Sequence, residues 1–226
     1  MIGAVALYQT SIGKKVVMAV TGVILYLYVL AHMLGNLKVF TGARHFNDYA
    51  IFLREVGYPV VDHEVLLWGV RIVLLASLVL HITAAYQLTR QDLAGRPVNY
   101  ARRQYLAATY ASRTMRWGGV LIGLFVVYHL LHLTTGTLLP GFQGHQQAYA
   151  NVVLAFRNQV AAIIYLVAMI ALGFHLYHGV RSAAQTLGWW SRGNAGFWQG
   201  LAIISAVVIA GGFATVPLAV LTGVVR

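Results

Sequence analysis

The chain has 226 residues, of which 59% are hydrophobic and only 9% are charged, and its mean hydropathy is +0.72. This composition leaves too little polar surface to cover a soluble globule, so the sequence predicts an integral membrane protein. The formal net charge of +11 does not point to nucleic acid, because in a membrane protein the distribution of basic residues matters more than their sum. The absence of cysteine excludes disulfides, thiolate haem ligation and cysteine-held iron–sulfur clusters within the chain.

Five apolar segments are long enough to cross a bilayer, which takes about 20 helical residues. We expect transmembrane helices at about 16–36, 66–88, 117–138, 160–180 and 198–222. The first follows Lys14 and Lys15 as a signal peptide would, but it is long, contains His32 and lacks a clear small-residue cleavage site. The prediction is therefore an all-α membrane protein with a single domain, residues 1–226.

Basic residues are divided unequally between the two sides of the membrane. With the N-terminus inside, ten are cytoplasmic: Lys14, Lys15, Arg90, Arg96, Arg102, Arg103, Arg113, Arg116, Arg181 and Arg192. Six lie on or near the other side: Lys38, Arg44, Arg54, Arg71, Arg157 and Arg226. The positive-inside rule therefore predicts a cytoplasmic N-terminus and a C-terminus outside. A basic inner face also suits a soluble partner or anionic lipid, although the plain positive-inside bias is the simpler explanation.

Two connections carry signals of their own. The outer connection at about 39–64 contains the partly amphipathic stretch FNDYAIFLREVGYPVVDHE, which we expect to lie along the membrane interface. The inner loop, 89–116, is the longest polar connection on its side, and its Gly95, Pro97 and Asn99 favour a turn over one continuous helix.

Two further patterns concern how the helices relate to one another. The fifth span is rich in glycine, alanine and valine, and we expect Gly196 and Gly200 to permit close helix approach. A displacement of 97 residues aligns MAVTGVILYLYVLAH with MRWGGVLIGLFVVYH and matches His32 with His129. His132 has no partner in this register. The six matches in fifteen positions suggest an internal similarity between the first and third spans.

Histidines occur in four of the five spans, where ionisable side chains are costly and usually face the bundle interior. At a rise of 1.5 Å per residue, His32 lies roughly 25 Å and His129 roughly 20 Å above the nearest cytoplasmic basic residue. By the same rise, His81 lies about 13 Å and His175 about 9 Å above it. The histidines therefore fall into an outer pair and an inner pair, and each pair draws on two helices.

Two pairs of inward imidazoles at two depths are what two haems with six-coordinate iron require. Such iron has no open position for a substrate and serves electron transfer. Haem propionates need cationic or hydrogen-bonding partners, and Arg71 at the outer level and Arg90 and Arg181 at the inner level are placed for this. His178 is a further candidate for such a role.

Two other interpretations stay open at this point. A single histidine in a membrane helix is more often an interhelical hydrogen-bond donor than a metal ligand, so the chain could be a haem-free anchor or small transporter. Imidazoles also relay protons near neutral pH, although the spans contain almost no acidic residues to complete a relay.

The sequence resembles the cytochrome b membrane anchor of succinate dehydrogenase and fumarate reductase, in its single-chain, five-helix, diheme form. The resemblance rests on SIGKKVVMAVTG leading to His32, LVLHITAAYQLTR followed by NYARRQY, GVLIGLFVVYHLLH, and GFHLYHGVRSAAQTLGWW. The last is the most telling, because the spacing of His175, Gly179 and Trp189 recurs in that family. A cytochrome b subunit of a hydrogenase or formate dehydrogenase is the alternative within electron transfer.

The resemblance implies a subunit without a catalytic site for the dicarboxylate, in a bacterial cytoplasmic membrane. Its partners would be a flavoprotein subunit and an iron–sulfur subunit, and its cofactors two haem b, with a quinone, generally menaquinone, as substrate. Ser11 and Lys14 lie near the inner face, where a quinone pocket is expected. Glu55 in the outer loop is the acidic residue best placed to exchange protons with a quinone beside the outer haem, and an ordinary solvated loop carboxylate is the alternative interpretation.

His129 rather than His132 is the expected ligand of the third span. The internal register pairs His129 with His32, and the family places this ligand about ten residues after a glycine, as His129 follows Gly119. His132 lies roughly 4.5 Å nearer the outer surface and is turned by about 60°. We expect it to hydrogen-bond a haem propionate or a quinone carbonyl instead.

Overall fold

The computed structural model describes residues 4–95 and 110–226, and these residues form helices and turns without a strand. The α-helices are α1 (Ala4–Gln9), α2 (Ser11–Leu37), α3 (Ala43–Glu55), α4 (Val65–Ala94), α5 (Tyr110–His129), α6 (Ala148–Arg157), α7 (Gln159–Thr186) and α8 (Ala195–Leu221). Short 3₁₀ helices occupy Lys38–Thr41 and His145–Gln147, and α5 continues as the π-helix η2 (Leu130–Thr134).

Five helical stretches are long and apolar enough to cross a membrane, which confirms the predicted fold class. They are Ser11–Thr41, Val65–Ala94, Met115–Thr134, Gln159–Thr186 and Ala195–Leu221. The first begins five residues earlier than predicted, because Thr10 caps it with its side-chain oxygen. The third ends at Thr134 rather than at about 138.

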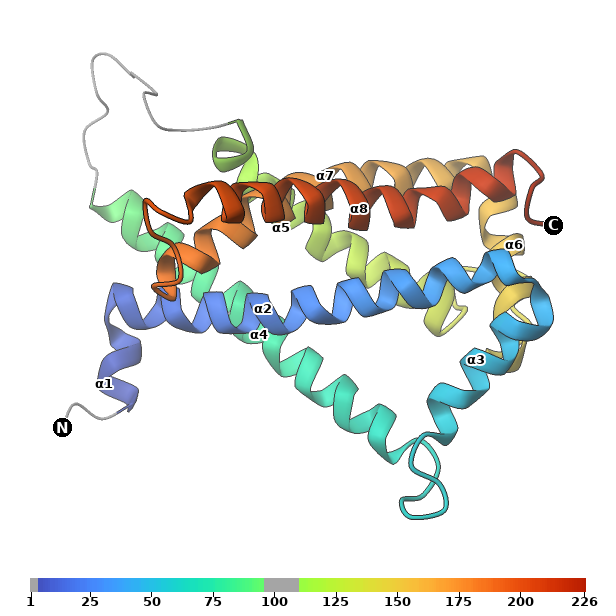
Figure 1. Cartoon of the computed structure of the whole chain (residues 1–226). Helices are drawn as coiled ribbons and strands as arrows, with labels where there is room; N and C mark the ends of the chain where they lie inside the picture. The colour runs from blue at the N-terminus through green and yellow to red at the C-terminus, as the bar shows by residue number, and fades with distance from the viewer. Residues whose placement is uncertain (1–3, 96–109) are drawn as a thin grey trace.

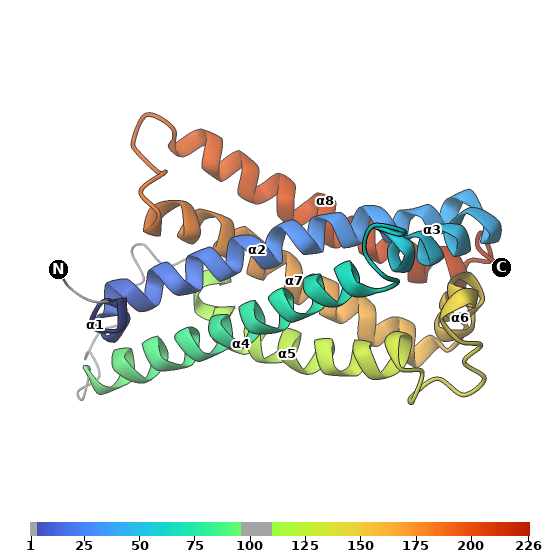
Figure 2. The same ribbon diagram turned by 90° about the horizontal axis from the view of Figure 1, so that it is seen from below.

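The bundle has three central helices and two peripheral ones (Figures 1 and 2). Helices α2, α7 and α8 pack on one another, whereas α4 packs mainly on α2 and α5 mainly on α7. The two termini lie at opposite ends of the bundle in both views. We call these the N-side and C-side ends, and the cytoplasmic location of the N-side end stays a prediction.

The C-side end is closed by α3 and α6, which lie across the ends of the spans (Figure 1). Phe46 of α3 packs edge-on against Tyr149 of α6, and the Tyr149 backbone N–H donates to Asn47 Oδ1 at 2.9 Å. Part of the outer stretch expected at the interface is therefore helical, and the turn at 56–64 leads from it into α4.

Central helices α2 and α8 approach most closely where Met33 lies over Gly212. Met33 is 2% exposed and packs with Leu176 and Ile209 in the middle of the bundle. A Cβ on Gly212 would lie 2.6 Å from the Met33 sulfur, whereas a Cβ on Gly196 or Gly200 would meet nothing within 4 Å. The expectation that Gly196 and Gly200 permit close approach was therefore wrong.

The inner loop lies largely outside the described residues, and with it Pro97, Asn99 and the NYARRQY motif. The structure describes the two ends of this loop: α4 ends at Ala94 with Gly95 as its cap, and residues 110–116 belong to α5.

The contact at Gly212 predicts a stability difference between two adjacent glycines. Gly212→Ala should lower the free energy of unfolding by about 1–3 kcal/mol, because the added methyl group overpacks against the buried Met33. Gly211→Ala is the matched control, since its Cβ would meet nothing within 4 Å. Thermal unfolding of both variants in detergent checks this, and equal midpoints would contradict the packing described.

Candidate functional site

The four histidines singled out by depth lie in two pairs inside the bundle. His32 of α2 and His129 of α5 form the C-side pair, with ring centroids 5.9 Å apart. His81 of α4 and His175 of α7 form the N-side pair, with ring centroids 6.2 Å apart. The structure thus brings together the same partners that helical rise predicted.

Each histidine pair joins a peripheral helix to a central helix. In both pairs this central helix differs from the one on which the peripheral helix mainly packs. Helix α4 packs mainly on α2, yet its His81 meets His175 of α7. Helix α5 packs mainly on α7, yet its His129 meets His32 of α2. The two pairs therefore cross the bundle along opposite diagonals.

The hydrogen bonds of His81 fix which ring nitrogen carries the proton. Its Nδ1 lies 3.0 Å from the Met18 carbonyl oxygen, which can only accept. Thr21, 3.3 Å from the same Nδ1, already donates its hydroxyl proton to the Val17 carbonyl at 2.7 Å. Nδ1 therefore donates, which leaves Nε2 with a free lone pair, the state that a metal-ligating histidine needs.

The other N-side ring, His175, is placed differently. Its Nδ1 is buried and has no hydrogen-bond partner, a costly arrangement unless the group has a further role. Gly22 lets α2 lie close to the ring of His81, because a Cβ at position 22 would be 3.2 Å from His81 Cε1. The N-side pair is thus tightly packed in apolar surroundings, and one buried polar atom, His175 Nδ1, has no hydrogen-bond partner.

The C-side pair is surrounded by aromatic rings. Tyr28 stacks on His32 with ring centroids 5.4 Å apart, and Phe213 of α8 lies 5.6 Å from the same ring. On the other side, the Tyr165 hydroxyl lies 3.2 Å from His129 Nδ1. His129 therefore also has Nδ1 engaged and Nε2 available.

His132 is buried, at 3% exposed. Its Nδ1 lies 3.2 Å from the Tyr165 hydroxyl, the same atom that contacts His129. Its ring stacks on Tyr128 at 5.1 Å. The partner of this nitrogen is thus a protein side chain, and the hydrogen bond from His132 to a haem propionate or a quinone carbonyl stays a prediction.

The candidate cationic residues lie at both levels. Arg71 is half-buried in α4, with its guanidinium 4.7 Å from the centre of the Trp68 ring. Arg90 is exposed and donates to the Tyr86 hydroxyl at 3.2 Å. His178 and Arg181 are half-buried along α7, one and two turns beyond the N-side pair.

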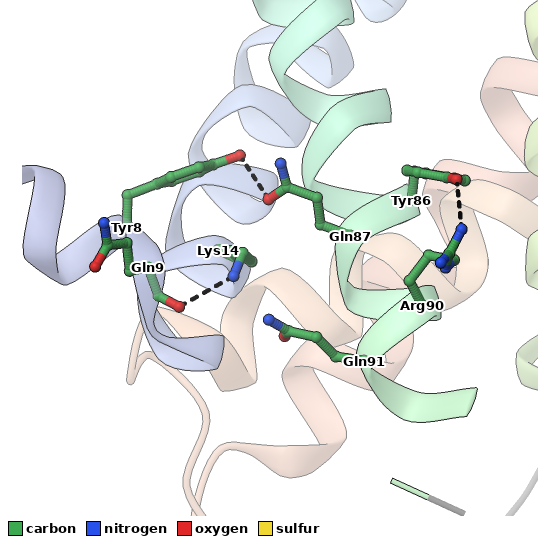
Figure 3. Close-up of a pocket in the computed structure, with 7 residues that line it drawn as sticks. All are labelled: Tyr8, Gln9, Lys14, Tyr86, Gln87, Arg90 and Gln91. Carbon is green, nitrogen blue, oxygen red and sulfur yellow. Dashed lines mark hydrogen bonds between the residues drawn. The ribbon is translucent and has the colours of Figure 1, made fainter. Parts of the chain in front are cut away.

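A cavity of about 450 Å³ opens at the N-side end between α1, α2 and α4 (Figure 3). Its lining residues are Tyr8, Gln9, Lys14, Tyr86, Gln87, Arg90 and Gln91. Lys14 is 8% exposed, and its ammonium donates to the Gln9 carbonyl at 3.0 Å. The Ser11 hydroxyl lies 3.3 Å from Gln91 Oε1, at the edge of this cavity. The structure thus places Lys14 in the lining of this cavity and Ser11 next to it, through its contact with Gln91.

Glu55 lies apart from these residues, exposed at the last position of α3. The neighbouring carboxylate Glu64 is the one in an ion pair, 3.4 Å from Arg54. Glu55 is thus at the opposite end of the bundle from the N-side cavity.

The histidine pairs fit haem better than a bare metal ion. Across residues 4–95 and 110–226 there is no group of three or more histidine, cysteine or acidic side chains that could hold a metal ion. Haem iron takes only two ligands from the protein. Two imidazoles on one iron, with metal–nitrogen bonds of about 2 Å, would have ring centres about 6 to 6.5 Å apart. The observed separations of 5.9 and 6.2 Å are close to this range.

The fold defines a multi-pass helical membrane protein, with two pairs of histidines inside its helical bundle. Residues 92–215, more than half of the chain, match the family described as succinate dehydrogenase/fumarate reductase transmembrane subunit, and the chain belongs to this family. Neither the curated proteins nor the solved structures yield a match. The family is known for binding haem and quinone and for assembling with other subunits in one complex.

Three residues that position the histidines were missed from the sequence: Met18 and Thr21 beside His81, and Tyr165 beside His129. The depth argument could have found Tyr165, because it lies ten residues before His175, about 15 Å along the helix and level with the C-side pair. No sequence signal marks Met18, whose contribution is a backbone carbonyl.

Proposed function

We propose that the chain is the diheme cytochrome b membrane subunit of a bacterial succinate:quinone oxidoreductase. The observation that carries this proposal is the two diagonal histidine pairs, one at each level of the bundle. Haem b, when bound, supplies one-electron transfer without an open coordination site. Family membership favours this function over a hydrogenase or formate dehydrogenase subunit, a transporter or a haem-free anchor.

In this proposal the four histidines hold the two irons through Nε2. His81 is already in the required tautomer, because its Nδ1 proton is directed at the Met18 carbonyl. Arg71 supplies positive charge to propionates at the C-side level, and Arg90, Arg181 and His178 supply it at the N-side level. Along α7 the two levels are about 15 Å apart, so they cover much of a hydrocarbon layer of about 30 Å.

The proposed path runs from a soluble partner at the N-side end to a membrane quinone. A cytoplasmic N-side end follows from the distribution of basic residues and suits a flavoprotein and an iron–sulfur subunit as partners. It also suits anionic lipid at that face. The protein then resides in the bacterial cytoplasmic membrane and itself holds no catalytic residue for the dicarboxylate.

The N-side cavity is the proposed quinone site, with menaquinone as the quinone. Lys14, Ser11 and the glutamines around them offer hydrogen-bond donors to quinone carbonyl oxygens, and Tyr8 and Tyr86 offer aromatic walls. Glu55 is the second candidate, for proton exchange with a quinone at the C-side end.

Haem content tests the pairing. His81→Ala and His175→Ala should each remove the same spectral component from the reduced-minus-oxidised spectrum of the purified complex, and His32→Ala should remove the other. His145→Ala, in an exposed turn, is the control and should keep both. Loss of one common component in His81→Ala and His32→Ala would show that the pairs are wrong.

A second comparison separates the two histidines of the third span. His129→Ala should lose the C-side haem, whereas His132→Ala should keep it, because His132 contacts Tyr165 and lies in no centroid pair with His32. Haem stoichiometry and the oxidised spectrum provide the measurement. If only the His132 variant lost the C-side haem, the ligand assignment would be reversed.

Lys14→Gln tests the quinone site. It should lower succinate-driven quinone reduction by about tenfold or more, since a hydrogen bond from a charged donor contributes about 1.5–3 kcal/mol. The exposed neighbour Lys15→Gln is the matched control, and succinate oxidation with a soluble acceptor should be unchanged in both. If Glu55→Gln lowered quinone turnover and Lys14→Gln did not, the quinone would be at the C-side end instead.

A further inference from the structure

Tyr165 is a buried polar side chain beside the C-side pair. It is 7% exposed, and three rings pack around its own with centroid distances of 4.8 to 6.0 Å: Phe125, Tyr128 and Phe156. Its hydroxyl lies 3.2 Å from His129 Nδ1 and 3.2 Å from His132 Nδ1. One phenol oxygen thus stands between two imidazoles.

The number of protons determines how these groups bond. A phenol hydroxyl has one proton, so it can donate to one imidazole and must accept from the other. If His129 gives its Nε2 lone pair to iron, its Nδ1 carries the proton and donates to the Tyr165 oxygen. The Tyr165 hydroxyl then donates to His132 Nδ1, and His132 carries its own proton on Nε2.

The π-helix η2 contains one of the two imidazoles that reach this hydroxyl, His132. It begins directly after His129, and its wider turn is closed by the Thr135 N–H, which donates to the Leu130 carbonyl at 2.8 Å. In a regular α-helix a residue three positions on is offset by about 60°, as expected for His132 from the sequence. Single π turns inside α-helices occur frequently at functional sites.

We propose that Tyr165 is a positioning residue for the C-side haem ligand, and this inference rests on the proposed function. Its hydroxyl fixes the tautomer and the ring orientation of His129. As an acceptor that itself donates to His132, it makes the His129 ring a stronger electron donor. Stronger donation stabilises the oxidised iron, so the C-side haem has a lower reduction potential than it would have without this hydrogen bond.

The N-side pair is held differently, because the Thr21 hydroxyl beside His81 Nδ1 donates its proton to the Val17 carbonyl. The acceptor for His81 is a backbone carbonyl, and a substitution at Met18 would leave it in place. A single side-chain change at position 165 should therefore act on one haem and leave the other as an internal reference.

The experiment is a redox titration of both haems in the purified complex, with the oxidised EPR signals recorded alongside. Tyr165→Phe keeps the ring and removes the hydroxyl. We expect both haems to be retained, the C-side potential to rise, its EPR signal to change, and the N-side potential to stay as in the wild type. Tyr128→Phe is the matched control, because it removes a hydroxyl from the same aromatic cluster and leaves that of Tyr165 in place.

Variants at His132 test the second hydrogen bond. His132→Leu removes the acceptor and should raise the C-side potential by less than Tyr165→Phe does. His132→Asn keeps an acceptor oxygen near the Nδ1 position and should restore the potential toward the wild-type value. The double variant Tyr165→Phe/His132→Leu should match Tyr165→Phe alone, because the two residues act in one chain.

Several results would overturn the inference. An unchanged C-side potential in Tyr165→Phe would do so, and so would an equal shift of both haems. Where Tyr165→Phe loses the C-side haem, the His132 variants decide the question. Equal C-side haem potentials in His132→Leu and His132→Asn would then overturn the inference. A wild-type complex without a C-side haem would overturn the proposed function itself, and its spectrum shows this before any variant is compared.

Discussion

The requirement that an imidazole inside a membrane find a polar partner organises this bundle. Four histidines lie in spans otherwise made of apolar side chains, where an unpaired polar group is expensive. The rings face one another across two diagonals, whereas the hydrogen-bond partners of His81 and His129 come from α2 and α7, the helices on which α4 and α5 chiefly pack. The rotation of α4 and α5 about their axes is constrained by this requirement as much as by packing.

The two levels meet the same requirement with different groups. At the N-side level a backbone carbonyl accepts from His81, and glycine at position 22 brings α2 close to the ring. At the C-side level a phenol between two imidazoles does so, inside the apolar cluster that also holds α6 and the end of α8. The C-side site is therefore part of the best-packed region of the molecule, whereas the N-side site lies toward an end that contains a polar cavity.

The number of spans and the partners of each histidine could be predicted from the sequence, because hydropathy and helical rise depend only on position along the chain. Properties that depend on rotation or on departure from a regular helix could not. Gly212 rather than Gly196 or Gly200 forms the close contact, since facing Met33 is a matter of helix rotation. His132 lies in a π turn that a regular α-helical projection does not include, and its contact with Tyr165 was not predicted. The N-side cavity depends on α1 folding back onto α2, and the sequence of this six-residue helix does not predict that contact.

The one-sided packing of α4 has a consequence for biogenesis. In membranes, helices insert first and associate afterwards, so the order of association follows the contacts each helix can make alone. Most side chains of α4 between Val65 and Ala76 are exposed, and the helix diverges from α2 toward the C-side end (Figure 1). The contacts of α2 with α4 and of α7 with α8 are the most extensive in the bundle, ahead of those that join α2 to α7 and α8. The packing thus favours an assembly pathway in which α4 associates with α2 first, and this pair then joins α7 and α8.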